Sequence, residues 1–145
     1  MKDLFKLEDS YAYLIYRTVR ALRRQFIRIA SEQGFDLYPE QWFVLVRIHN
    51  NPGCSQIELA KDFEDRPSMT RALRAMKQKG WLSIDEDPED KRKHKIHLTK
   101  AGLKLFDSMV KAVSKERNRM FGSLDEEDFK HFRKIMDTIF DRAKD

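Results

Sequence analysis

The chain has 145 residues, a length typical of one domain, and 41% of them are hydrophobic, with ten Phe and two Trp. This composition excludes a disordered chain, and five Gly and four Pro are too few for a fold built from many tight turns. The 29 Lys and Arg exceed the 24 Asp and Glu by 5, and the pI near 9.3 permits a polyanionic partner without requiring one.

Several classes of protein are excluded by what the sequence lacks. A single cysteine, Cys54, cannot form an internal disulfide, and no stretch approaches the roughly 18 apolar residues of a membrane span. Acidic residues stand near the start, where a secretory signal needs an apolar run. The four histidines are scattered, and no catalytic constellation or phosphate-binding glycine motif is present. We therefore expect a cytoplasmic protein that is not an enzyme and needs no metal or cofactor.

A long first helix is predicted from about residue 8 to residue 31, ended by Gly34. Its apolar residues recur at spacings of three and four and form one face: Leu14, Ile15, Val19, Leu22, Phe26 and Ile29. The opposite face carries Arg17, Arg20, Arg24 and Arg28. This basic face is either a solvated helix surface or a ridge that faces DNA.

Three shorter helices follow. The first of them has Pro39, a residue suited to a first helical turn, at its start and is stopped by Asn50, Asn51, Pro52 and Gly53. The next begins at Ser55, because Ser55 and Glu58 stand three residues apart as in a capping box. A tight turn separates it from the following helix, and the two together predict a helix-turn-helix unit.

The second helix of this unit, from Arg66 to Gly80, carries Pro67 in its first turn. Its charged residues are all basic: Arg66, Arg71, Arg74, Lys77 and Lys79. In a helix-turn-helix protein the first turns of this helix reach the base edges of a major groove, and here they hold Ser68, Thr70 and Arg71. A structural surface helix usually mixes both signs of charge, so this segment is a candidate DNA reader.

A β-hairpin is predicted next, with strands at 81–84 and 95–98 joined by a charged stretch. Basic residues near its tip, after a basic helix, are typical of a winged helix. An acidic side chain, Asp87 or Asp90, could hold Arg92 by a bidentate pair and aim it at the duplex. The alternative is an exposed loop of solvated charges.

Two further helices complete the predicted order of four helices, two strands and two helices. Thr99 is predicted to cap the fifth helix, and Ser123 with Glu126 to form the capping box of the sixth. These helices and the N-terminus carry more apolar residues than a monomer of this size can bury, among them Leu4, Phe5, Leu7, Phe132, Ile135, Ile139 and Phe140.

Three segments resemble the MarR (multiple antibiotic resistance regulator) family of winged helix-turn-helix transcription factors. Residues 37–42, LYPEQW, resemble the family's LTxxQW segment, with Tyr38 in place of its usual Thr. Thr70-Arg71 and the KGWL of residues 79–82 resemble its recognition-helix segment. Residues 90–102 resemble its wing signature DxRxxxLxLTxxG, with Ile96 in place of a common Leu.

The resemblance implies one MarR-type domain over 1–145, with a DNA-binding lobe at 37–102 and a helical dimerisation region at 1–34 and 103–145. It implies an obligate homodimer that binds a pseudo-palindromic operator, as a repressor by family habit. Arg92 would enter a minor groove with support from Asp90. The implied DNA-binding residues are Ser55, Arg66, Pro67, Ser68, Thr70, Arg71, Arg74, Lys77, Asp90, Lys91, Arg92 and Lys93.

Sensing and partner choice remain open at this point. Some relatives bind phenolic or other anionic small molecules between the dimerisation helices and the DNA lobe, which makes candidates of Tyr11, Tyr16, Arg17, Tyr38 and Trp42, although aromatic residues at helical spacing also suit a core. Cys54 precedes a helix N-terminus, which favours a thiolate.

The alternative function is a dimeric winged-helix module that binds a protein. Salt dependence distinguishes DNA binding from protein binding, because a protein that neutralises about 10 DNA phosphates gives a slope near −9 when log affinity is plotted against log salt concentration.

Overall fold

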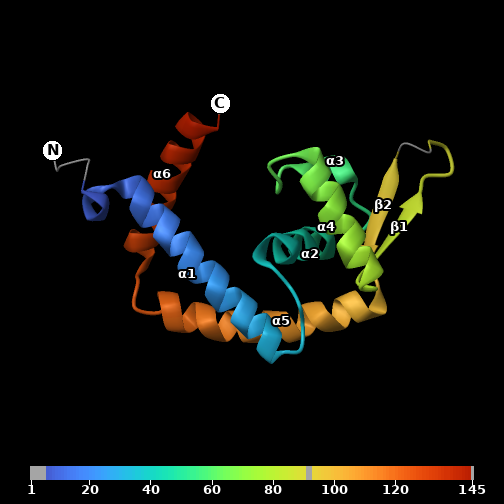
Figure 1. Cartoon of the computed structure of the whole chain (residues 1–145), viewed down its shortest axis with the longest axis horizontal. Helices are drawn as coiled ribbons and strands as arrows, with labels where there is room; N and C mark the ends of the chain where they lie inside the picture. Colours follow the sequence, from blue (N-terminus) through green and yellow to red (C-terminus); the bar gives the residue numbers. More distant parts are fainter. Residues whose placement is uncertain (1–5, 91–92, 145) are drawn as a thin grey trace. The chain divides into compact units, whose positions relative to one another are not determined.

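The computed structural model describes residues 6–90 and 93–144, and Figure 1 shows their arrangement. After a 3₁₀ turn at Leu7–Asp9, the helices and strands are α1 (Tyr11–Glu32), α2 (Pro39–Asn50), α3 (Gln56–Ala60), α4 (Arg66–Gln78), β1 (Leu82–Glu86), β2 (His94–Leu98), α5 (Lys100–Phe121) and α6 (Glu126–Ala143). The predicted fold class, mainly helical with one β-hairpin, is confirmed. The apolar residues Leu4 and Phe5 and the wing residues Lys91 and Arg92 lie outside the described part.

The chain divides into two compact units, Met1–Lys111 and Ala112–Asp145. In the first unit α2 packs on β2, α4 packs on β1, and α3 packs on both α4 and β2. Their inward side chains form the core, joined by residues early in α5: Val44, Leu45, Ile48, Leu59, Met69, Leu73, Met76, Leu82, Ile96, Leu105 and Met109. The helix-turn-helix and the hairpin therefore share one hydrophobic core.

The long first helix begins later than predicted. Residues Leu7–Asp9 form the separate 3₁₀ turn, and the Ser10 hydroxyl accepts a hydrogen bond from the Tyr13 N–H to cap α1. The predicted end is confirmed, since Gly34 has a φ of +89° and Phe35 N–H donates to Ala30 O at 2.8 Å.

The hairpin is also longer than predicted, and its first strand begins one residue later. Trp81 lies outside β1, while Asp85 and Glu86 belong to the ladder and pair with Lys95 and His94. A third chain segment joins the sheet at an isolated bridge between Cys54 and Ile96. Gly53 N–H donates to Ile96 O, and Ile96 N–H donates to Cys54 O, both at 3.0 Å. The loop before α3 is thereby fixed to the wing.

The predicted caps are partly wrong. The last helix is capped by Asp125, whose carboxylate accepts from Asp128 N–H at 2.9 Å, and not by Ser123 and Glu126. The Asp128 carboxylate in turn accepts a hydrogen bond from Asp125 N–H at 3.0 Å. An aspartate one residue before the helix carries a full charge at the positive end of the helix dipole, which favours it over a serine further away. The cap predicted at Thr99 is confirmed, because its hydroxyl accepts from Gly102 N–H at 3.0 Å.

The α1 and α2 helices are joined by a bidentate ion pair. Arg23 donates to the two carboxylate oxygens of Glu40 at 2.6 and 3.1 Å. The hydrogen bonds from Arg23 hold the pKa of Glu40 below its ordinary value of 4.5, against a smaller opposing effect of burial. A carboxyl with a lowered pKa contributes stability above its ordinary pKa, and that contribution is lost as the pH falls through the folded-state value.

We therefore expect the free energy of unfolding to fall on acidification below pH 4.5 by less in a Glu40→Gln variant than in the parent protein. Urea denaturation at neutral and acidic pH measures the difference. The matched control is Glu127→Gln, which removes an exposed pair with Lys130 at 3.7 Å. Equal acid sensitivity of the parent and the Glu40→Gln variant would show that this ion pair contributes nothing to stability.

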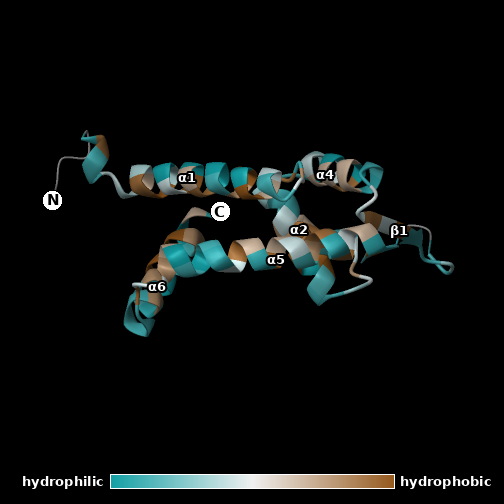
Figure 2. Cartoon of the chain, turned by 90° about the horizontal axis from the view of Figure 1, so that it is seen from below, coloured by the Kyte–Doolittle hydropathy of each residue, from teal (hydrophilic) through white to brown (hydrophobic). Residues whose placement is uncertain are grey.

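The second unit leaves its apolar side chains uncovered. Within it, the rings of Phe121 and Phe129 lie 6.3 Å apart, and no residue of α6 is buried. Its exposed large hydrophobic residues are Phe121, Leu124, Phe129, Phe132, Ile135, Ile139 and Phe140. Hydrophobic residues recur along α6 in Figure 2. In the described residues no helix combines the length and apolarity needed to cross a membrane.

Candidate nucleic-acid interface

The α4 helix presents a basic face to solvent because its apolar residues are turned inward. Met69, Leu73 and Met76 are buried and recur at spacings of four and three. The opposite side of the helix is exposed and holds Arg66, Pro67, Thr70, Arg71, Arg74 and Lys77. Acidic residues are absent from α4, so the exposed face is uniformly cationic.

The first turn of α4 holds Arg71 in place through a chain of hydrogen bonds. Asp65, the N-cap, accepts from Ser68 N–H at 2.6 Å. Arg71 Nη2 in turn donates to Ser68 Oγ at 3.2 Å. The N–H of Ser68, then its hydroxyl, and to a smaller extent the charge of Arg71 hold the pKa of Asp65 below its ordinary range. The ionised form of Asp65 is therefore favoured, and it orients Ser68, which in turn holds Arg71. This role was not predicted from the sequence, although aspartate is a preferred N-cap.

The Thr70 side chain is partly committed to its own helix. Its hydroxyl donates to Arg66 O at 3.1 Å, which leaves the oxygen lone pairs and the methyl group facing solvent. Thr70 can therefore accept a hydrogen bond from a base or contact a thymine methyl group, but it is less suited to donate.

Hydrogen bonds join the described residues on the two sides of the wing tip. Asp87 N–H donates to Lys93 O at 2.8 Å, and Lys93 N–H donates to Asp90 O at 2.9 Å. The Asp87 carboxylate accepts from Glu89 N–H at 2.9 Å, which orders the acidic side of the turn. Asp90 is half-buried and Lys93 is exposed. The predicted pair between Asp90 and Arg92 involves a residue outside the described part and stays a prediction.

The end of α4 is fastened to the wing and to the loop before α2. Lys79 Nζ donates to Asp36 O at 2.6 Å and lies 4.8 Å from the centroid of the Trp81 ring. The Thr99 hydroxyl donates to Gly80 O, so the end of β2 is bonded to the residue that terminates α4. These contacts set the position of the hairpin relative to the basic helix.

Ser55 lies at the first residue before α3, as predicted. Its hydroxyl oxygen accepts from Glu58 N–H at 3.3 Å, which leaves the hydroxyl hydrogen available to an acceptor such as a phosphate. Glu58 does not complete the predicted capping box, because its carboxylate accepts from the Asn51 amide at 2.7 Å.

The predicted effector residues do not share one environment. Trp42 is buried, with its ring stacked 5.3 Å from Phe106 and tilted against Phe26 at 6.2 Å, so it belongs to the core. Tyr11 and Tyr16 are 74% and 73% exposed, and Arg17 is also exposed. Tyr38 lies under the Arg23 guanidinium, 5.5 Å from ring centroid to Cζ. The described protomer therefore does not bring these five residues together, and a ligand cleft lined by them stays a prediction.

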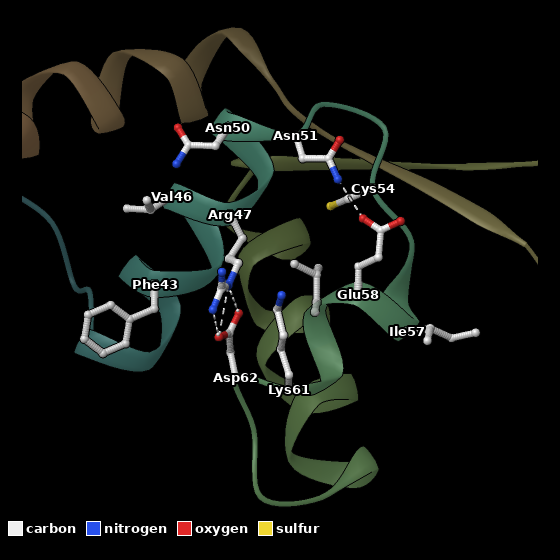
Figure 3. Close-up of a pocket in the computed structure, with 11 residues that line it drawn as sticks. Phe43, Val46, Arg47, Asn50, Asn51, Cys54, Ile57, Glu58, Lys61 and Asp62 are labelled. Carbon is white, nitrogen blue, oxygen red and sulfur yellow. Dashed lines mark hydrogen bonds and ion pairs between the residues drawn. The ribbon is translucent and has the colours of Figure 1, made fainter. Parts of the chain in front are cut away.

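A hollow of about 450 Å³ lies elsewhere, between α2 and α3 (Figure 3). Four of its polar lining residues pair with one another, since Arg47 Nε donates to the Asp62 carboxylate at 2.8 Å and the Asn51 amide donates to the Glu58 carboxylate at 2.7 Å. None of the predicted effector residues lines it.

Cys54 contributes to one wall of this hollow and is only 4% exposed. Burial, and secondarily the charge of Glu58, raises the pKa of the thiol above its ordinary value. A raised pKa disfavours the thiolate that a redox sensor requires.

Three comparisons show which known proteins this chain is similar to. Residues 37–94 match the sequence profile of the MarR family. A transcriptional regulatory protein described for the hcr operon of Thauera aromatica is 33% identical over 95 residues, which are 64% of this chain and 56% of that protein. The match thus spans little more than half the length of this curated relative.

Solved structures share the fold over the whole chain. The PcaV transcriptional regulator of Streptomyces coelicolor, crystallised with its natural ligand, is 20% identical with a TM-score of 0.84, covering 100% of this chain and 99% of its own. The transcriptional repressor CouR, bound to a 23-mer DNA duplex, is 23% identical with a TM-score of 0.81, covering 96% of this chain and 98% of its own.

Proposed function

Because residues 37–94 match the MarR family of transcriptional regulators, we propose that this chain is a member of that family and that it regulates transcription by binding double-stranded DNA as a homodimer. The observation that carries the proposal is the exposed basic face of α4, whose first turn holds Arg71 through Ser68. The DNA-bound repressor CouR, which has the same fold, supports this reading. Binding to a bacterial chromosome would place the protein in the cytoplasm.

The dimer is proposed from uncovered apolar surface. Val19 and Leu22 on α1 and Phe132, Ile135 and Phe140 on α6 are 39–66% exposed. Large apolar residues exposed along each of these two helices exceed what a monomer normally leaves in water. We assign them to a two-fold interface formed by the regions 1–34 and 103–145.

Two α4 helices would then enter successive major grooves, about 34–36 Å apart, on a pseudo-palindromic operator. Ser68, Thr70 and Arg71 would face base edges, while a second group would contact phosphates: Ser55, Arg66, Arg74, Lys77, Lys91 and Lys93. Pro67 would shape the first turn, and Arg92, supported by Asp90, would enter the minor groove. Bound in this way, the dimer would block transcription as a repressor. Release by a small phenolic or anionic effector is part of the proposal, supported by the ligand-bound structure of PcaV.

The proposal is tested by selecting bound duplexes from a random pool and measuring the affinity of the selected sequence across salt concentrations. We expect a pseudo-palindrome, and a log–log slope near −9 if about 10 phosphates are neutralised. Failure to enrich any sequence, with flat salt dependence, would favour a protein-binding module instead.

Arg71→Ala should lower affinity for the selected duplex by about 1–3 kcal/mol, roughly a factor of 5 to 150, and relax its sequence preference. The reason is that a guanidinium bidentate to guanine discriminates between bases, and here Ser68 restricts its direction. Competition binding with the selected and a scrambled duplex measures both effects. Lys77→Ala is the comparison, because loss of a phosphate contact should weaken both duplexes alike. An equal loss of affinity on both duplexes for Arg71→Ala would show that Arg71 contacts only the phosphate backbone of the DNA.

A further inference from the structure

The outer face of α1 carries a row of cations that the helix-turn-helix and wing do not explain. Arg17, Arg20, Arg24 and Arg28, here called the arginine stripe, are all exposed. The α1 helix contains five arginines, and its one acidic residue, Glu32, is the last residue of the helix. The spacing of three, four and four residues places the stripe along a single face.

The stripe is opposite the face that packs on the rest of the first unit. At 100° per residue, the packing residues Phe26 and Ile29 lie about half a turn from the stripe. Phe26 contacts Trp42, and Ile29 is 8% exposed. The apolar side of this end of α1 is therefore already occupied, and the arginines are not needed to cover it.

Like Arg71 and Arg74 of α4, the stripe arginines have no carboxylate partner among the described residues, in contrast to three other arginines. Arg23, Arg47 and Arg119 each pair with an acidic side chain at 2.6–2.8 Å. Over residues 6–90 and 93–144 no ion pair or side-chain hydrogen bond engages the four members of the stripe. Four unneutralised guanidiniums in one row repel one another, which is a cost that an anionic partner would relieve.

A groove of about 590 Å³ runs along this part of α1. It is lined by four arginines and two short residues: Arg17, Thr18, Arg20, Ala21, Arg23 and Arg24. The short side chains leave room between the arginines, and the groove has no aromatic or large aliphatic lining. Its chemistry suits a chain of phosphates better than an apolar protein segment or a lipid surface, which would need apolar anchors.

We infer that the arginine stripe binds the phosphate backbone of double-stranded DNA that flanks the operator. The inference rests on the proposed function. From Arg17 to Arg28 the stripe spans 11 residues, about 16 Å at 1.5 Å per residue, which corresponds to about five phosphates of one strand. Guanidinium groups bind phosphate oxygens in bidentate geometry, so the stripe extends the contact with DNA without reading its sequence.

The test compares two duplexes. One is a duplex of about 20 base pairs selected from a random pool, and the other is the same sequence with about 20 base pairs of random flank on each side. The variant is the triple substitution Arg20→Gln, Arg24→Gln and Arg28→Gln, which keeps helix propensity. The control triple Lys111→Gln, Lys115→Gln and Lys134→Gln removes the same charge from exposed positions elsewhere. Fluorescence anisotropy across salt concentrations gives the slopes, and circular dichroism checks the fold.

On the long duplex the slope of log affinity against log salt concentration should be shallower in the stripe variant, by about 0.9 for each lost phosphate contact. The three substitutions should therefore reduce the slope by close to 3 for each protomer that reaches the flank. On the short duplex its slope and affinity should equal those of the parent and of the control triple. Parent-like behaviour of the stripe variant on the long duplex would overturn the inference while leaving the proposed function intact. An equal loss on both duplexes would also overturn it, as would binding of the parent to anionic phospholipid vesicles that the stripe variant has lost. If the parent selects no duplex at all, the proposed function itself fails.

Discussion

A Phe132→Glu, Ile135→Glu double variant should be monomeric and should bind an operator duplex about 10²–10⁴-fold more weakly than the parent. Both side chains lie on one face of α6 and are 60% and 56% exposed in the protomer. Their exchange should leave the protomer folded, since they bury little within it. Two carboxylates placed opposite their own copies across a two-fold interface would repel and lose their hydration. The second half-site would then no longer be bound intramolecularly.

Light scattering gives the mass, circular dichroism confirms the helices, and anisotropy with the selected duplex gives the affinity. The matched control is Lys130→Gln with Lys134→Gln, which makes the same change in net charge on the opposite face of the same helix, where both positions are exposed. The control should remain dimeric and bind DNA close to the parent level. A double variant of Phe132 and Ile135 that still forms the parent's dimer would remove α6 from the interface.

Gly102→Ala should lower the free energy of unfolding by about 3 kcal/mol, at the upper end of the usual cost of overpacking. A Cβ added to Gly102 would overlap the carbonyl oxygen of Trp81. That oxygen already accepts a hydrogen bond from Thr99 N–H at 3.0 Å, so backbone at the junction of α4, the wing and α5 would have to move. Trp81 itself is 8% exposed and cannot shift outward without uncovering apolar surface.

Urea denaturation of the parent and the Gly102→Ala variant measures the change. Ala101→Ser, one residue earlier and exposed, is the control and should alter stability by no more than about 0.5 kcal/mol. Parent-like stability of Gly102→Ala would mean that the α5 start can slide away from Trp81 without cost. Because the wing is fastened at the same junction, we also expect weaker DNA binding from this variant at temperatures where it is still folded.

Local sequence signals predicted most of the fold. Pro39 and Pro67 marked the starts of α2 and α4, and Gly34 and Gly80 marked ends with positive φ. The errors arose where two local signals compete: Ser123 and Asp125 both precede an acidic residue by three positions, and only the folded backbone decides which one caps α6.

Contacts between distant segments were harder to predict. The pairing of Cys54 with Ile96 joins residues 42 apart, and nothing in a strand pattern of one residue reveals it. The aromatic pattern had the same limit, since helical spacing could not distinguish Trp42, which is stacked on Phe106, from the exposed Tyr16. The basic face of α4 was predicted because its charges share a single local helix.

The bridge between Cys54 and Ile96, together with the bond from Thr99 to Gly80, limits how binding could be controlled. Because β2 is anchored at Ile96 and directly after its end at Thr99, the hairpin is held at a fixed position relative to α4 in each copy of the proposed dimer. A regulatory signal could not loosen the wing from α4 alone. In the proposed dimer it would have to change the distance between the two α4 helices, so that this distance no longer matches the pitch of the double helix.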